Sequence, residues 1–357
     1  MAIFRRLILS VVLHSSLLFA DKSGVVNTVA GGGRAHHGGT ADCMDYQTPT
    51  MDGIGRGARF NYPWGIVFDA EENVLYVGDC GCPETVHSND RLRKIDIKTG
   101  RVTTLAGSAQ GYKDGIGENA KFRHVSGIVM DQVEKVLYVA DSDVKGKARS
   151  ISVGRNLKSS TRAIIIGPAF SKTNNAPEFP LHLPLTGMKG NQEKKIVTYI
   201  PRRLLIYDNN SVLFCSACEV WINIPILGVV TSLAGGGREG FKDGVGRQAR
   251  FNYPEGLYFD TDYNLLYVAE FDSHAIRIVT PAGEVRTLAG GTEGFKNGIG
   301  KQARFFHPTG LTFDNKRKII YVTDQYNHMV RSITAVGSTV VDPKKSGKKI
   351  REMFEIF

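Results

Sequence analysis

The cysteines of this 357-residue chain could serve two kinds of chemistry, metal binding or disulfide formation. Thiolates from Cys80, Cys82, Cys215 and Cys218 would complete a tetrahedral structural zinc site. The spacing argues against zinc, because a single residue separates Cys80 from Cys82 where such sites normally have two. Cys43 brings the number of cysteines to five, and thiols oxidise in a secretory route. We therefore expect disulfide bonds among these five cysteines, with one thiol left over, and no metal site.

A glycine-rich loop of the pattern Asp/Asn-Gly-x-Gly-x-x-Ala could instead indicate phosphate or calcium binding. The loop lacks the lysine and Ser/Thr of a phosphate loop, and it does not space oxygen ligands as a calcium loop does. An Asp or Asn that bonds to nearby backbone and a glycine with positive φ explain it as a turn. It occurs four times, beginning at Asp52, Asp114, Asp243 and Asn297.

The loop belongs to a unit that recurs along the chain. Gly256 and Gly310 mark the same position in two copies, and Gly65 and Gly127 mark it in two earlier ones. A degenerate copy without the loop lies between Gly127 and Gly256, which makes five copies. In each copy, four short segments of alternating or β-branched apolar residues are separated by Gly, Asn and Asp, as expected for four antiparallel strands.

Units of about 45 to 60 residues with four strands are typical of propeller blades. We therefore predict an all-β fold, a β-propeller of four-stranded antiparallel blades, with five recognisable repeats and six blades as the alternative. The segments Phe251-Asn-Tyr-Pro-Glu-Gly-Leu257, Leu266-Tyr-Val-Ala-Glu270 and Asn327-His-Met-Val-Arg331 resemble the NHL repeat, over residues 52 to 337. The resemblance implies the propeller fold but no particular activity, because NHL propellers host several functions.

An N-terminal segment, residues 24–31, resembles the fourth strand of a copy, residues 285–290, although no complete copy precedes it. We predict that it is a displaced strand that closes the ring. It would pair with the last blade, near residues 331–334 or 338–341, and so remove an exposed sheet edge.

Four copies place an acid at the end of the second strand and an arginine in the third strand. The degenerate copy has Ala217 and Trp221 instead. The joint loss indicates a contact across the hairpin, because an unpaired buried charge costs several kcal/mol. We interpret these residues as structural ion pairs and not as catalytic groups. The pairs are Asp79 with Arg93, Asp141 with Arg149, Glu270 with Arg277, and Asp324 with Arg331.

The histidines and catalytic motifs give no positive support for an enzyme. His274 and His328 share one repeat position and His307 precedes a repeated proline, so a structural role is favoured. The sequence contains neither His-Glu-x-x-His nor Gly-x-Ser-x-Gly. We predict no catalytic, cofactor-binding or metal-binding residues. A metal-assisted propeller lyase or hydrolase that acts at the central channel is the alternative, on analogy of fold alone.

The domain organisation follows from composition. Residues 1–20 have the basic start and short apolar run of a signal peptide, residues 21–341 form the propeller, and residues 342–357 form a basic tail. An insertion at about 155–203 has nine Lys/Arg against two Glu, and Asn209 is the one candidate N-glycosylation site.

These features favour a monomeric binding or scaffold protein that is secreted or lumenal, without a transmembrane segment after signal cleavage. One propeller face and the basic insertion would recognise a protein or an anionic glycan, and no specific nucleic acid.

Overall fold

The computed structural model of the chain describes residues 23–32, 50–81, 90–141, 147–152, 165–166, 203–208, 211–216, 218–224, 229–260, 262–263 and 265–335. The signal peptide, the basic tail, Asn209 and nearly all of the basic insertion lie outside these residues.

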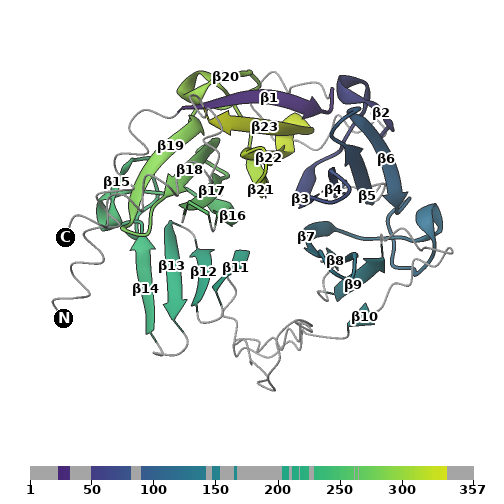
Figure 1. The fold of residues 1–357 in the computed structure, drawn as a ribbon, viewed down its shortest axis with the longest axis horizontal. Coiled ribbons are helices and arrows are strands. Elements are labelled where there is room, and N and C mark those ends of the chain that lie inside the picture. The colour runs from purple at the N-terminus through teal and green to yellow at the C-terminus, as the bar shows by residue number, and fades with distance from the viewer. Residues whose placement is uncertain are drawn as a thin grey trace, which may run out of the picture.

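The described residues form five antiparallel sheets, one for each repeat, and Figure 1 shows them arranged around a common centre. We number the five sheets in the order of their repeats along the chain. The first contains β3 (Pro63–Asp69), β4 (Val74–Asp79), β5 (Arg91–Asp96), β6 (Arg101–Ala106) and β2 (Gly53–Ile54). The second contains β7 (Val125–Asp131), β8 (Val136–Asp141), β9 (Lys147–Ser152) and β10 (Ile165–Ile166). The third contains β11 (Arg203–Asp208), β12 (Ser211–Ser216), β13 (Glu219–Ile224) and β14 (Val229–Ala234).

The fourth and fifth sheets complete the described arrangement. The fourth contains β16 (Pro254–Asp260), β17 (Leu265–Glu270), β18 (Ala275–Val279), β19 (Glu284–Gly290) and β15 (Gly244–Val245). The fifth contains β21 (Pro308–Asp314), β22 (Ile319–Asp324), β23 (Met329–Ala335), β1 (Gly24–Ala30) and β20 (Gly298–Ile299). In every sheet the first strand of the repeat lies nearest the centre of Figure 1.

The core lies between neighbouring sheets, in separate apolar clusters. One cluster joins the first and second sheets, one the third and fourth, one the fourth and fifth, and one the fifth and first. All residues of β4 and β17 are buried, because a neighbouring sheet covers each face of these strands. The repeated phenylalanine and the loop alanine lie in the same clusters. Phe251 and Ala249, for example, have no exposed surface.

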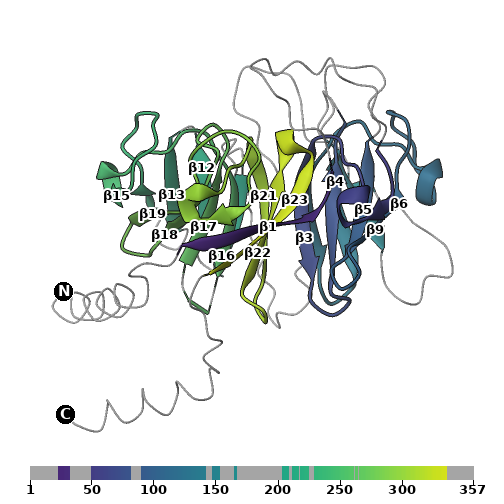
Figure 2. The same cartoon turned by 90° about the horizontal axis from the view of Figure 1, so that it is seen from above.

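The N-terminal strand β1 belongs to the same sheet as the C-terminal repeat, as Figures 1 and 2 show in purple and yellow. It pairs with β23, with Val26 opposite Ile333 and Thr28 opposite Arg331. The register is the first of the two expected from the sequence. Val26 has no exposed surface and packs in the cluster between the fourth and fifth sheets. The first and last parts of the described chain therefore complete one sheet together.

A buried arginine links the glycine-rich loop to the second strand in three sheets. In the first sheet, Arg93 Nη1 lies 2.7 Å from Asp79 Oδ2, and Arg93 Nη2 lies 2.9 Å from Asp52 Oδ1. The guanidinium also donates to the carbonyl oxygens of Met51 and Arg59. Arg277 and Arg331 repeat this arrangement, with Glu270 and Asp243 around Arg277, and Asp324 and Asn297 around Arg331. The side chains of all three arginines are fully buried.

Two of these loops connect their sheet to the preceding one through a pair of backbone hydrogen bonds. The backbone N–H of Gly31, at the end of β1, donates to the carbonyl oxygen of Gly55, and the N–H of Gly55 donates to the carbonyl oxygen of Gly100. Gly235, Gly246 and Gly283 form the equivalent pair of bonds between the third and fourth sheets. Gly55 and Gly246 have φ of 52° and 54°, a left-handed conformation that glycine adopts without strain.

We expect Arg277→Met to destabilise the protein more than Arg277→Met combined with Glu270→Gln. The single replacement leaves a buried carboxylate without its cation, which costs about 3–5 kcal/mol, and the double replacement removes both charges. Urea unfolding followed by circular dichroism measures the free energy of each variant. Additive effects of the two substitutions would contradict the pairing.

Deletion of residues 24–30 is expected to abolish the folded monomer, because it exposes the edge of β23 and opens the apolar cluster that contains Val26. Size-exclusion chromatography and thermal melting measure the effect. A synthetic peptide of residues 23–32, added to the deletion variant, should restore a cooperative melting transition. A deletion variant that melts like the full chain would contradict the role of β1.

Candidate ligand-binding face

Aromatic side chains form a continuous line at the end of the propeller where the innermost strands begin. The line consists of Tyr253, Phe271, His307, Tyr326 and Tyr62. Successive ring centroids lie 6.2, 4.0, 4.5 and 5.0 Å apart. The residues come from the ends of strands in the fourth, fifth and first sheets, so only the ring arrangement brings them together. We call these five residues the aromatic row.

Most of the aromatic row is accessible to solvent. Tyr253, Phe271, His307 and Tyr326 are half-buried, and Tyr62 is buried. Phe306 is also half-buried, and its ring centroid lies 4.9 Å from that of His307 and 5.2 Å from that of Tyr326. Other copies of the repeat have Asn61, Arg123 and Asn252 at the position of Phe306. The phenylalanine is therefore a departure from the repeat that adds apolar surface beside the row.

The backbone around the row is held in an unusual conformation. Tyr62, Tyr253 and His307 have φ of 56°, 60° and 51°, although a residue before proline is normally extended. Histidines from the preceding sheet support two of these positions. The N–H of His307 donates to His274 Nδ1 at 3.2 Å, and the N–H of Tyr62 donates to His328 Nδ1 at 3.1 Å. These two imidazoles thus link neighbouring sheets, which is a structural role of the kind expected from the sequence.

Two carboxylates lie beside the paired imidazoles. Asp272 Oδ1 lies 3.5 Å from His307 Nδ1, and Glu293 Oε2 lies 4.0 Å from His274 Nε2. Burial lowers the pKa of His307 to about 4, and the neighbouring His274 contributes to the shift. Burial also lowers the pKa of His274, although Glu293 and Asp272 oppose that shift. Both imidazoles are therefore neutral at neutral pH, and they do not cancel the negative charge of the carboxylates.

The acids expected to form ion pairs also accept hydrogen bonds from the backbone of this face. Asp324 Oδ1 accepts a hydrogen bond from the backbone N–H of Phe306 at 2.7 Å, and Glu270 Oε1 accepts one from Asn252 at the same distance. Asp141 accepts bonds from Arg123 and His124. The structure brings together three of the four expected pairs, and of Arg149 in the fourth pair it describes the backbone alone.

Two of the cysteines depart from the expectation of disulfide bonds. Cys80 and Cys218 are not disulfide-bonded in the structure. Cys80 packs in the cluster between the first and second sheets, where its thiol donates to the carbonyl oxygen of Val125. A buried cysteine in such a place acts as a small apolar side chain. Cys43 and Cys82 lie outside the described residues, and only the backbone of Cys215 is described, so a disulfide among them stays a prediction.

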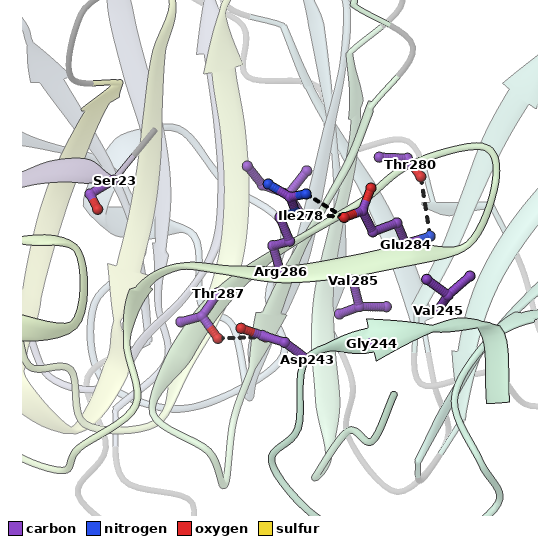
Figure 3. A pocket seen from close by; sticks show the side chains of 10 residues that line it. All are labelled: Ser23, Asp243, Gly244, Val245, Ile278, Thr280, Glu284, Val285, Arg286 and Thr287. Atoms are coloured by element: carbon purple, nitrogen blue, oxygen red, sulfur yellow. Dashed lines mark hydrogen bonds and ion pairs between the residues drawn. The ribbon is translucent and has the colours of Figure 1, made fainter. Parts of the chain in front are cut away.

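A pocket of about 500 Å³ lies at the outer side of the fourth sheet, near the start of β1 (Figure 3). Its polar side chains contact one another. Arg286 pairs with Glu284, and Thr287 donates to Asp243, which also binds Arg277. We therefore assign these polar groups to the scaffold. Within the described part of the chain, no three His, Cys, Asp or Glu side chains gather as a metal site requires, and no helix could cross a bilayer.

We expect His307→Tyr to reduce the loss of stability in acid. The unfolded chain binds more protons than the folded chain between pH 6.5 and about 4, because the pKa of His307 falls on folding. Stability therefore decreases as pH falls through that range, by about 2 kcal/mol at pH 5 from this group. Tyrosine, as in Tyr62 and Tyr253, removes this contribution. Urea unfolding at pH 7.5 and pH 5 measures it, and an unchanged acid dependence would contradict the assignment.

Comparison with known proteins gives relatives for most of the chain. No protein-family model matches it. It is 26% identical over 313 residues to NHL repeat-containing protein 2 of Gallus gallus, and 27% identical over 304 residues to the Homo sapiens protein of that name. The alignments cover 79% and 78% of this chain but 39% and 40% of the relatives. The chain thus spans about two fifths of the length of these curated relatives.

Solved structures resemble the chain in fold. An auxiliary nutrient binding protein from Bacteroides ovatus has a TM-score of 0.60 at 19% identity, over 88% of this chain and 77% of that protein. A protein of unknown function from Bacteroides thetaiotaomicron has a TM-score of 0.58 at 15% identity, over 88% and 76%. The chain is thus similar in sequence to NHL repeat-containing proteins, and its repeated antiparallel sheets and these solved structures agree on a β-propeller fold.

Proposed function

We propose that the protein is a secreted or lumenal binding module, a propeller of five blades that recognises a protein or glycan through the aromatic row. The observation that carries this proposal is the half-exposed Phe306 at a position where other copies have polar or charged residues. Aromatic side chains are enriched where proteins bind partners, because they give large contact area at low entropic cost.

The charged groups that recur in the repeats support binding over catalysis. Arg277 and Arg331 are buried and use their guanidinium groups to hold the loops, the strands and the backbone. Phe306 and His307, whose positions vary among the copies, lie on the aromatic face instead. A scaffold of constant residues that carries a variable face is the usual arrangement in binding domains.

Two further features agree with this function. The solved structure with a TM-score of 0.60 is that of an auxiliary nutrient binding protein, so a similar fold serves binding there. The pattern of residues 1–20 supports entry into the secretory route. The basic insertion at about 155–203 would add an electrostatic contact to an anionic partner.

The full chain should bind members of a glycan array or a random peptide library, and Phe306→Asn should weaken that binding at least tenfold. The factor corresponds to the loss of an aromatic anchor worth about 2 kcal/mol. Asparagine occurs at this position in Asn61 and Asn252, so the fold should tolerate it.

Val133→Ser is the matched control, because Val133 is 80% exposed in a hairpin at the other end of the innermost strands. It should leave binding unchanged. Array hits that bind the Phe306→Asn variant as strongly as the original chain would refute the assignment of this face.

A further inference from the structure

We propose that the aromatic row receives an arginine side chain of a protein or peptide ligand, with Asp272 and Glu293 as the groups that pair with its charge. The inference rests on the proposed function, because it names the chemistry of the ligand that the aromatic face would bind.

The two carboxylates come from different segments and lie beside two neighbouring imidazoles. Asp272 follows β17, and Glu293 lies between β19 and β20. They reach His307 and His274, whose ring centroids lie 4.7 Å apart. The carboxylate side chains are 39% and 55% exposed, so an incoming cation can approach both of them.

The aromatic rings beside the carboxylates suit a guanidinium. A cation is attracted to the face of an aromatic ring within about 6 Å of its centroid, and the planar guanidinium also stacks on the ring. Phe271, Phe306 and Tyr326 all contact the imidazole of His307 and are half-buried. The surroundings of His307 and His274 therefore combine partly exposed aromatic rings with partly exposed carboxylates.

The same chain already uses this combination inside its scaffold. Arg277 Cζ lies 4.8 Å from the ring centroid of Phe241 and 5.3 Å from that of Phe251, while its guanidinium pairs with Glu270. Arg331 lies in the same way near Phe295 and Phe305. Aromatic rings with an adjacent carboxylate are thus the environment in which this fold holds arginine.

The charges favour a cationic ligand over a neutral sugar. A sugar ring can stack on an aromatic side chain without any nearby charge, whereas two carboxylates beside neutral imidazoles produce a negative potential that attracts cations. Arginine is favoured over lysine because its planar group can stack on a ring and pair with a carboxylate at the same time.

The experiment measures the fluorescence anisotropy of a labelled Gly-Ser peptide with two arginines, titrated with the full chain. A second peptide has citrulline in place of arginine, which keeps the shape and removes the charge. We expect the citrulline peptide to bind roughly three- to tenfold more weakly, and higher salt to weaken the arginine peptide. Glu293→Gln, Asp272→Asn and Phe306→Asn should each reduce binding of the arginine peptide at least threefold.

Glu134→Gln is the matched control, because Glu134 is an exposed carboxylate in the β7–β8 hairpin at the opposite end of the strands. It should not change binding, and thermal melting of each variant verifies folding. Equal affinity for the two peptides, no binding of either at millimolar concentration, or an equal effect of Glu134→Gln would overturn the proposal. If a neutral glycan binds the original chain and Phe306→Asn removes that binding, the arginine proposal is overturned while the binding function stands. If no ligand depends on Phe306 for its binding, the binding function itself is refuted.

Discussion

The buried guanidinium groups of Arg93, Arg277 and Arg331 are the constraint on which the arrangement depends. A charged group with no access to water must have acceptors around it, so each arginine fixes the position of every group that it contacts. In the fifth sheet, Arg331 holds Asn297 of the loop and Asp324 of β22. Asp324 in turn accepts a bond from the N–H of Phe306, immediately before His307. The segment that contains His307 of the aromatic row is therefore attached to Arg331 through a single carboxylate.

The third sheet shows what remains when this arrangement is lost. In the first and fourth sheets, Thr104 and Thr287 of the outer strand donate to the Asp of the loop. Ser232 keeps a hydroxyl at the same repeat position, but its repeat has no such loop, and the hydroxyl has no hydrogen-bond partner among the described residues. The loop, the arginine, the acid and the outer-strand hydroxyl thus form one hydrogen-bonded unit. A repeat that lacks the loop no longer needs the other three groups.

The repeat in the sequence predicts most of the fold because each copy acts as a control for the others. It gives the four strands of a sheet, the inward Ala249 and Phe251, and the register of β1 against β23. It does not predict that Asp52 and Asp243 of the loop bind the arginines, because side chains far apart in sequence meet only after the sheets form. The aromatic row was not predicted for the same reason, although Phe306 at an asparagine position was a visible signal. The disulfide expectation fails at Cys80 because the count of cysteines contains no information on burial.

The pairing of β1 with β23 has a consequence for how the protein is made. Gly24 pairs with Ala335, so the last sheet contains residues from both ends of the described chain. Synthesis proceeds from the N-terminus, and the first strand must therefore wait unpaired while the other four sheets emerge and form. Contacts between distant parts of a chain form slowly, and unpaired strand edges in the interval favour aggregation. Completion of the fifth sheet is thus the final step, and a chain that is truncated before β23 lacks the strand with which β1 pairs.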